Sequence, residues 1–160
     1  MMKKRPIREP VATASAARSP NKVYEDHALS ELRKAGYRIT MPRVQVIRAL
    51  VDTTTALSAY AIHEKITTSG GMIDVVSVYR ILSTLQEIGL IYHIGVVDGY
   101  FPCRLPNATL RSEVIVDEET YTVKEFTLPE AVVDSLKKQA SESKIEISAI
   151  KVEILGKTAK

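Results

Sequence analysis

The side chains best suited to recognising another molecule lie close together in the stretch Asp74–Leu90. Within it, Ser77, Tyr79 and Arg80 supply hydroxyl, phenol and guanidinium groups. An arginine can present two parallel donors to guanine O6 and N7, and a tyrosine ring can pack on a thymine methyl group or donate to a phosphate. This chemistry indicates contact with nucleic acid, provided that the rest of the chain supports it, because any amphipathic helix has a polar face.

The apolar residues of the same stretch predict the helix that would present these donors. They recur every three or four residues and form one stripe, so Ser77, Tyr79 and Arg80 face away from it. Asp74 can cap the start of this helix, and Gly89 can end it. A strand is predicted directly afterwards, which suggests a recognition helix followed by a wing. The stripe consists of Val75, Val78, Leu82, Leu85 and Ile88.

Three further helices are predicted before this one. The first covers Tyr24–Ala35, the second is capped by Thr40 with Pro42 in its first turn, and the third is capped by Ser58. After Gly89, the predicted strands Leu90–Val96 and Tyr100–Leu105 flank Asp98-Gly99, a strong signal for a two-residue hairpin turn. Helices followed by a hairpin predict a winged helix-turn-helix domain over residues 24–105.

Residues 106–160 predict a second, smaller domain. Strands are expected at Glu113–Asp117 and Thr120–Phe126, a helix at Leu128–Ser143, and a strand at Ile145–Leu155 with a β-bulge where its alternation changes parity. Three strands and one helix have too little core alone, so a partner subunit is expected. The predicted fold class is therefore α+β, with an N-terminal winged helix-turn-helix domain and a small C-terminal α/β dimerisation domain.

Composition limits the class of protein. One cysteine in 160 residues excludes an intramolecular disulfide framework and makes a reducing, intracellular compartment the default. No apolar run approaches the roughly 18 residues that a membrane span needs. We expect a cytoplasmic protein without membrane contact. It is not expected to be an enzyme, since no Ser/His/Asp, Cys/His or paired-carboxylate constellation has usable spacing.

The positive charge of the chain is concentrated at its start. Met1–Lys22 has six basic residues and one acidic residue, whereas residues 24–105 have eight of each. We expect residues 1–23 to be a disordered basic arm. Such an arm can add phosphate contacts through counterion release, but a solubilising tail or a transit peptide would have the same composition. Because residues 24–105 are balanced, DNA binding would need dimerisation, the arm, or both.

Several motifs, in order and at the right spacing, resemble the DNA-binding domain of the ferric uptake regulator family. They are G-Y-R-I-T-M-P-R at Gly36–Arg43, Leu57-Ser58-Ala59, S-V-Y-R at Ser77–Arg80, and the leucine pattern of Leu82–Leu90, within a match that covers about Ala28 to Leu105. The resemblance implies a homodimer that binds double-stranded DNA. It implies that Tyr79 and Arg80 face bases in the major groove, that Arg38 enters the minor groove, and that Thr40, Arg43 and Ser77 contact phosphates.

The second half departs from the family, which binds divalent metal through His and Cys residues. Arg111–Thr120, which corresponds to the family's His-rich segment, contains neither residue type, and the whole chain has only His27, His63, His93 and Cys103. We predict no metal site and no metal cofactor, although zinc, iron or manganese binds to family members. Ion pairs of Arg104 or Arg111 with the acids of Asp117–Glu119 are expected instead. Cys103 is expected to be a packing residue.

The sequence thus predicts a dimeric, sequence-specific DNA-binding transcriptional regulator of bacterial type, with repression as the expected mode and without metal sensing. Two alternatives stay open: a winged-helix module that binds another protein, and a regulator that responds to a small molecule at the domain hinge. The balanced charge of residues 24–105 favours the first alternative, whereas the S-V-Y-R and G-Y-R-I-T motifs oppose it.

Overall fold

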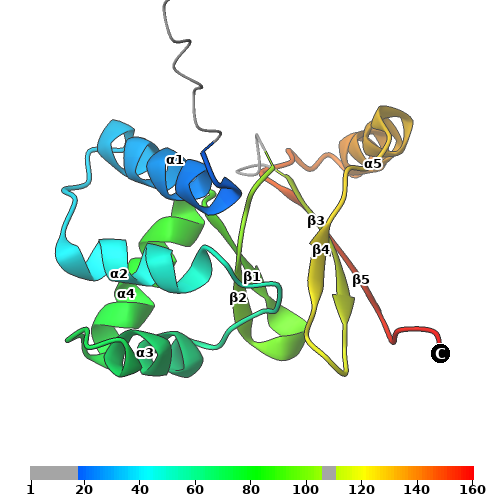
Figure 1. The fold of residues 1–160 in the computed structure, drawn as a ribbon. Helices are drawn as coiled ribbons and strands as arrows, with labels where there is room; N and C mark the ends of the chain where they lie inside the picture. The colour runs from blue at the N-terminus through cyan, green and yellow to red at the C-terminus, as the bar shows by residue number, and fades with distance from the viewer. Residues whose placement is uncertain (1–17, 106–110) are drawn as a thin grey trace, which may run out of the picture.

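The structure is a computed structural model that describes residues 18–105 and 111–160. Four helices form one side of the molecule, and two small sheets with a fifth helix form the other (Figure 1). The helices of the first side are α1 (Pro20–Lys34), α2 (Met41–Leu50), α3 (Ala59–Thr68) and α4 (Val75–Glu87).

The four helices enclose one apolar core. Its largest fully buried side chains come from every helix, and they include Leu32, Ile47, Ile62 and Leu82. The helix starts follow the predicted capping: Ser58 Oγ accepts from the Ala61 N–H at 3.1 Å, and Asp74 Oδ1 accepts from the Ser77 N–H at 2.9 Å. Thr40 precedes α2, but its side chain makes no capping hydrogen bond, so that part of the prediction is wrong.

The first helix begins earlier than its apolar pattern predicted. Ser19 Oγ accepts from the Lys22 N–H at 3.3 Å, and Pro20 occupies the first turn, where a missing N–H costs nothing. Residues 20–23 are therefore helical rather than part of the disordered arm predicted for residues 1–23. The expectation for residues 1–17 lies outside the described residues.

The wing differs from the predicted two-residue hairpin. Strands β1 (Ile91–Ile94) and β2 (Gly99–Pro102) pair antiparallel with Ile94 opposite Gly99, and a 3-10 turn at Gly95–Val97 followed by Asp98 connects them. Asp98 adopts the left-handed backbone conformation, at φ 41°, whereas Gly99 does not. A Cβ on Gly99 would lie 2.8 Å from Ala56 Cβ, so this glycine serves a close approach of two chain segments rather than a turn.

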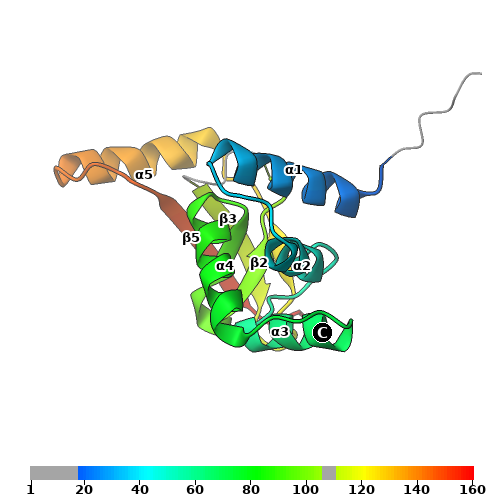
Figure 2. The ribbon, with the colours of Figure 1, turned by 90° about the vertical axis from the view of Figure 1, so that its left-hand side faces the viewer.

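The second sheet has the strand order β4-β3-β5. Strand β3 (Arg111–Asp117) pairs antiparallel with β4 (Val123–Glu125) and parallel with β5 (Ile150–Gly156). Helix α5 (Glu130–Glu142) makes the crossover from β4 to β5, and it projects from the body of the molecule (Figure 2). The prediction of a β-bulge is wrong. Ile145–Ala149 lies outside β5, and the strand begins at Ile150, after the point where the apolar alternation shifts by one residue.

A second core joins the wing to this sheet. Tyr92, Ile94, Phe101 and Cys103 from the wing and its end pack with Ala56 and with three valines of the sheet, Val114, Val116 and Val123. The two halves of the chain thus share buried side chains. In the part of the chain that the structure describes, no helix combines the length and apolarity needed to cross a membrane.

Candidate nucleic-acid interface

Helix α4 presents the predicted donors on its free face. Val78 and Leu82 are fully buried, whereas Tyr79 is 42% exposed and Arg80 is exposed as well. Figure 2 views the side of the molecule on which α4 lies, with α2 and α3 beside it. The exposed phenol and guanidinium belong to consecutive residues of the helix, as the apolar spacing predicted. Both groups are accessible to a ligand that approaches this face.

Ser77, one of the predicted phosphate contacts, takes part in the N-terminal cap of α4. Ser77 donates its hydroxyl to Asp74 Oδ2 at 2.6 Å while its N–H donates to Oδ1, and these hydrogen bonds lower the pKa of Asp74. The Ser77 hydroxyl hydrogen is therefore committed to the cap. Its oxygen can still accept a hydrogen bond, but the residue acts first to fix the start of the helix.

Tyr60 of α3 is a neighbour that the sequence reasoning missed. Its ring stands edge-on to the Tyr79 ring, with centroids 6.4 Å apart and an interplanar angle of 85°. Tyr60 is 65% exposed and Val76 of α4 is 58% exposed. A large aromatic residue on the polar side of α3, opposite Ala59 and Ile62, was the available signal. The Tyr60 ring therefore lies beside the ring that is predicted to face the bases.

The turn before α2 holds the other predicted contacts. Arg43 Nη1 donates to the Arg38 carbonyl oxygen at 2.6 Å, and its guanidinium lies 5.3 Å from the centre of the Tyr37 ring. Arg43 is thus a residue that shapes the turn, and its Nε is buried without a hydrogen-bond partner. Arg38 and Thr40 are exposed. Their side chains are accessible to a ligand, and the hydrogen bond from Arg43 to the Arg38 carbonyl oxygen holds the turn that carries them.

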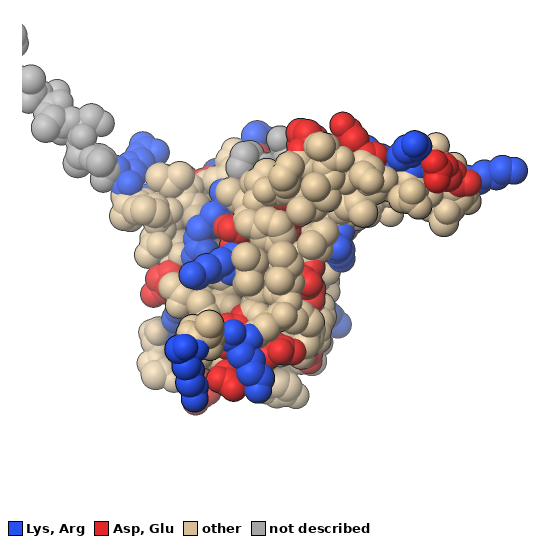
Figure 3. Space-filling model, turned by 90° about the vertical axis from the view of Figure 1, so that its right-hand side faces the viewer, with Lys and Arg blue, Asp and Glu red and all other residues tan. Residues whose placement is uncertain are grey.

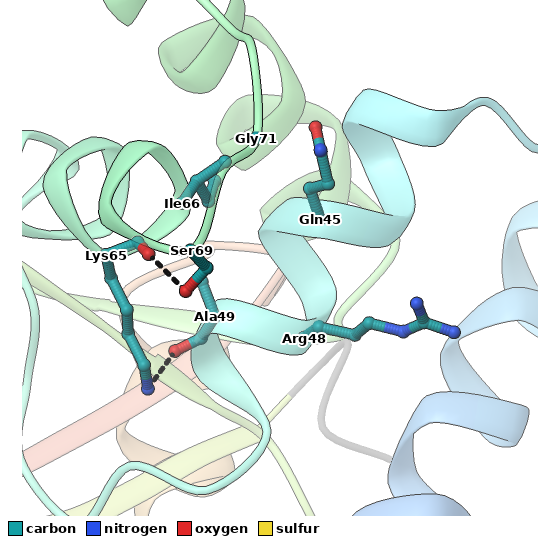
Figure 4. Close-up of a pocket in the computed structure, with 7 residues that line it drawn as sticks. All are labelled: Gln45, Arg48, Ala49, Lys65, Ile66, Ser69 and Gly71. Atoms are coloured by element: carbon teal, nitrogen blue, oxygen red, sulfur yellow. Dashed lines mark hydrogen bonds between the residues drawn. The ribbon is translucent and has the colours of Figure 1, made fainter.

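A hollow between α2 and α3 shows how the two helices are held (Figure 4). It has a volume of about 190 Å³, and on one side Lys65 donates to the Ala49 carbonyl oxygen at 2.8 Å and to Asp52 at 2.7 Å. A Cβ on Gly71 would lie 2.5 Å from Ile66 Cγ2, so the turn into α4 passes tightly over α3. These contacts set where α4 begins relative to α2.

Arg104 and Arg111 do not form the predicted ion pairs. Arg104 Nη2 donates to the carbonyl oxygens of Val51 and Thr53, and Arg111 binds the carboxylates of Glu113 and Glu130.

The acids of Asp117–Glu119 instead hold the end of the chain. Asp117 Oδ2 accepts from the Thr158 N–H at 3.0 Å and from the Thr158 hydroxyl, and Lys157 pairs with Glu119 at 3.2 Å. The hydrogen bond from the Thr158 hydroxyl is the main cause that holds the pKa of Asp117 well below its usual range. The prediction failed because β5 returns the terminal segment to the end of β3.

Three residues considered as metal ligands, His63, His93 and Cys103, have other partners or are buried. In residues 18–105 and 111–160, no three side chains of His, Cys, Asp or Glu lie together as ligands. His63 Nε2 lies 3.0 Å from the Ile73 carbonyl oxygen, and His93 pairs with Asp98 at 2.9 Å. Cys103 is 4% exposed, and burial raises the pKa of its thiol to about 11. A protonated thiol is a poor metal ligand.

Comparison with known proteins identifies relatives over most of the chain. The model of the ferric uptake regulator family matches residues 34–155. The ferric uptake regulation protein of Pseudomonas fluorescens is 31% identical over 102 residues, which cover 63% of this chain and 82% of that protein. Among solved structures, a zinc uptake regulator complexed with zinc and DNA superposes with a TM-score of 0.78 at 22% identity, covering 89% of this chain and 95% of the other.

A third protein, XcZur, was solved in two forms. The holo form superposes with a TM-score of 0.73 at 21% identity, covering 87% of this chain and 96% of that chain. The apo form gives 0.52 at 19% identity, covering 89% and 97%. Both forms have the fold of this chain.

These comparisons contradict the prediction that the protein takes no metal cofactor. A structure of the same fold was solved with zinc bound, and a relative in sequence is a ferric uptake regulation protein. The prediction counted His and Cys residues at particular positions. That reasoning is insufficient, because carboxylates, backbone carbonyls and water also bind divalent cations.

Proposed function

This chain belongs to the ferric uptake regulator family, and from that premise we propose that it is a dimeric, sequence-specific DNA-binding transcriptional regulator that acts as a repressor. The observation that carries the proposal is the free face of α4, where Tyr79 and Arg80 are exposed between buried residues of one apolar stripe. Because its ligand is DNA, we place its action in the cytoplasm. We assign it no catalytic activity.

The site residues take different roles in this proposal. Arg80 reads a guanine edge in the major groove, and Tyr79, supported by the Tyr60 ring, packs against a thymine methyl group. Arg38 enters the adjacent minor groove, where the negative potential attracts guanidinium groups. Thr40, Arg43 and Ser77 lie beside phosphates, and the last two also hold the turn and the cap in place.

Apolar side chains of the second half support a homodimer. Only Val133 of α5 is buried, whereas Val132 and Leu136 are exposed on the same helix, as is Ile154 on β5. Figure 3 views this side, where a broad area without charged side chains extends onto the projecting helix. A second copy that covered this area would bring two α4 helices to successive half-sites.

We further propose that metal does not switch DNA binding at the junction of wing and sheet. The side chains there already bond one another: Tyr92 donates to Glu125 at 3.0 Å, and Cys103 Sγ lies 3.0 Å from the Tyr92 hydroxyl. A cation would have to displace these hydrogen bonds before it could bind. Addition of zinc, iron or manganese to chelator-treated protein should therefore leave the DNA affinity within about a factor of two, well below the range of allosteric couplings.

Fluorescence anisotropy tests the function. Chelator-treated protein is titrated against DNA from its own upstream region and against a scrambled duplex, from low to physiological salt. We expect tight binding to the first duplex only, with a steep loss of affinity as salt rises, because phosphate contacts release counterions. Equal affinity for both duplexes would overturn the sequence-specific reader. Weak binding without salt dependence would favour a module that binds protein.

A further inference from the structure

One carboxylate oxygen collects three hydrogen bonds at the place where the two halves meet. Glu125 of β4 accepts through Oε1 from the Tyr92 hydroxyl at 3.0 Å, from the Arg104 N–H at 2.9 Å and from the Leu105 N–H at 3.3 Å. Tyr92 belongs to the wing, and Arg104 and Leu105 follow it. A single side chain of the second sheet thus holds the wing and the segment that leaves it.

Arg104 makes the matching connection toward the helices. Its Nη2 donates to the Val51 carbonyl oxygen at 3.0 Å and to the Thr53 carbonyl oxygen at 3.2 Å, just after α2 ends. The guanidinium carbon lies 5.2 Å from the centre of the Phe101 ring. Through its backbone and its side chain, this residue therefore joins the sheet, the wing and the end of α2.

Backbone contacts and packing surround these two side chains. The Val123 N–H donates to the Thr54 carbonyl oxygen at 3.0 Å, and the Ala56 N–H donates to the Tyr121 carbonyl oxygen at 2.9 Å. Tyr92 and Cys103 are buried in the core that wing and sheet share. A joint with a common core and hydrogen bonds on several sides has one preferred geometry, unlike a hinge that a bare linker would form.

We propose that Glu125 and Arg104 are positioning residues that fix the orientation of the winged-helix half on the C-terminal sheet. In a dimer built on that sheet, this orientation sets the distance between the two α4 helices, and hence the half-site spacing that the protein accepts. This inference rests on the proposed function.

Four full-length variants separate positioning from general stability. Glu125→Ala removes the acceptor oxygen, whereas Glu125→Gln keeps an acceptor at the same place and should rescue the behaviour. Glu118→Ala is the matched control, because it removes an exposed carboxylate from the turn of the same hairpin. Arg104→Met serves as a second disruptive variant, since it keeps an apolar stem over Phe101 while it loses both hydrogen bonds from Nη2 to the carbonyl oxygens.

The variants are compared by anisotropy on a duplex with one half-site, on a duplex with two, and on duplexes with one to three extra base pairs between the half-sites. We expect Glu125→Ala and Arg104→Met to bind the single half-site as the wild type does. On two half-sites they should bind about 5- to 150-fold more weakly, with reduced dependence on spacing. Glu125→Gln and Glu118→Ala should keep the affinity and the spacing dependence of the wild type.

Small-angle X-ray scattering provides a readout without DNA. We expect a larger radius of gyration for Glu125→Ala and Arg104→Met than for the wild type, at unchanged helix content by circular dichroism. Wild-type scattering and wild-type spacing dependence in both disruptive variants would overturn the inference. Absence of DNA binding by the wild type would overturn the proposed function alone, because the scattering comparison still tests the joint.

Discussion

The two halves of the molecule bury their apolar residues in different ways. In the N-terminal half, all four helices contribute fully or nearly fully buried side chains to one core, such as Leu32, Ile47, Ile62 and Leu82. In the C-terminal half, α5 buries only Val133, and no residue of β5 is buried. The first half completes its core within one chain. The second half lacks a cover on one side, and this is why we propose that a second copy supplies it.

Equivalent leucine truncations test this difference most strongly. Leu82→Ala should lower the free energy of unfolding by about 2–5 kcal/mol at every protein concentration, since Leu82 is fully buried within the chain. Leu136 is 40% exposed, so Leu136→Ala should change the stability of the monomer little and weaken the dimer instead. Urea unfolding and analytical ultracentrifugation measure the two effects. A large, concentration-independent loss for Leu136→Ala would contradict the comparison.

A methyl group at the wing probes the boundary of the two halves. Gly99→Ala should destabilise the protein by about 1–3 kcal/mol, because the new Cβ would lie 2.8 Å from Ala56 Cβ and 3.2 Å from the Ala56 carbonyl carbon. Gly95→Ala is the control in the same wing, since its Cβ would meet no heavy atom within 4 Å. Thermal unfolding measures the loss of stability in each of the two variants. Equal melting temperatures would mean that the wing can move away from Ala56 freely.

Acid should loosen the C-terminal half through Asp117. The pKa of this carboxyl is depressed in the folded state, so its stabilisation is present above the ordinary value of about 3.9 and is lost as pH falls toward the folded value. Asp117→Asn should lower the melting temperature at pH 7 by a few degrees and remove part of the wild type's decline below about pH 4. Melting curves from pH 7 to pH 3 measure this. Parallel declines in both proteins would exclude Asp117 as a cause.

The smallest effect concerns the thiol in the shared core. Cys103 is buried, and its pKa is raised to about 11, so a disulfide reagent at pH 8 should react with it about 100-fold more slowly in the folded protein than in urea. Absorbance of the released thiolate follows the reaction. Rapid reaction in the folded state would show that wing and sheet separate easily.

Patterns within one helix were readable from the sequence, and so were two of the three predicted caps. The stripe of α4 and the caps at Ser58 and Asp74 depend on residues within four positions of each other, and the structure has them as expected. The β-hairpin of the wing was also expected. Its loop was not, because Asp98-Gly99 signals a tight turn locally, whereas Gly99 in fact lies against Ala56, more than 40 residues earlier.

The partners of charged groups could not be predicted in the same way. Arg104 binds carbonyl oxygens more than 50 residues earlier, and Asp117 binds Thr158 because β5 lies parallel to β3. Neither distance along the chain nor residue type specifies such pairs. Tyr60 was missed for a related reason, since its significance depends on its place beside Tyr79. The absence of a cofactor was inferred from residue types alone, and the comparison with a zinc-bound neighbour contradicted it.

The most direct test of α4 as a reading helix is a base-by-base scan of one half-site with the wild type and Arg80→Ala. We use Lys138→Ala, which removes an exposed positive charge on α5, as the control for net charge. We predict that Arg80→Ala binds the intact site about 1–3 kcal/mol more weakly and loses discrimination at one guanine position. Lys138→Ala should keep the discrimination of the wild type at that position. Discrimination unchanged at every position in Arg80→Ala would contradict the account.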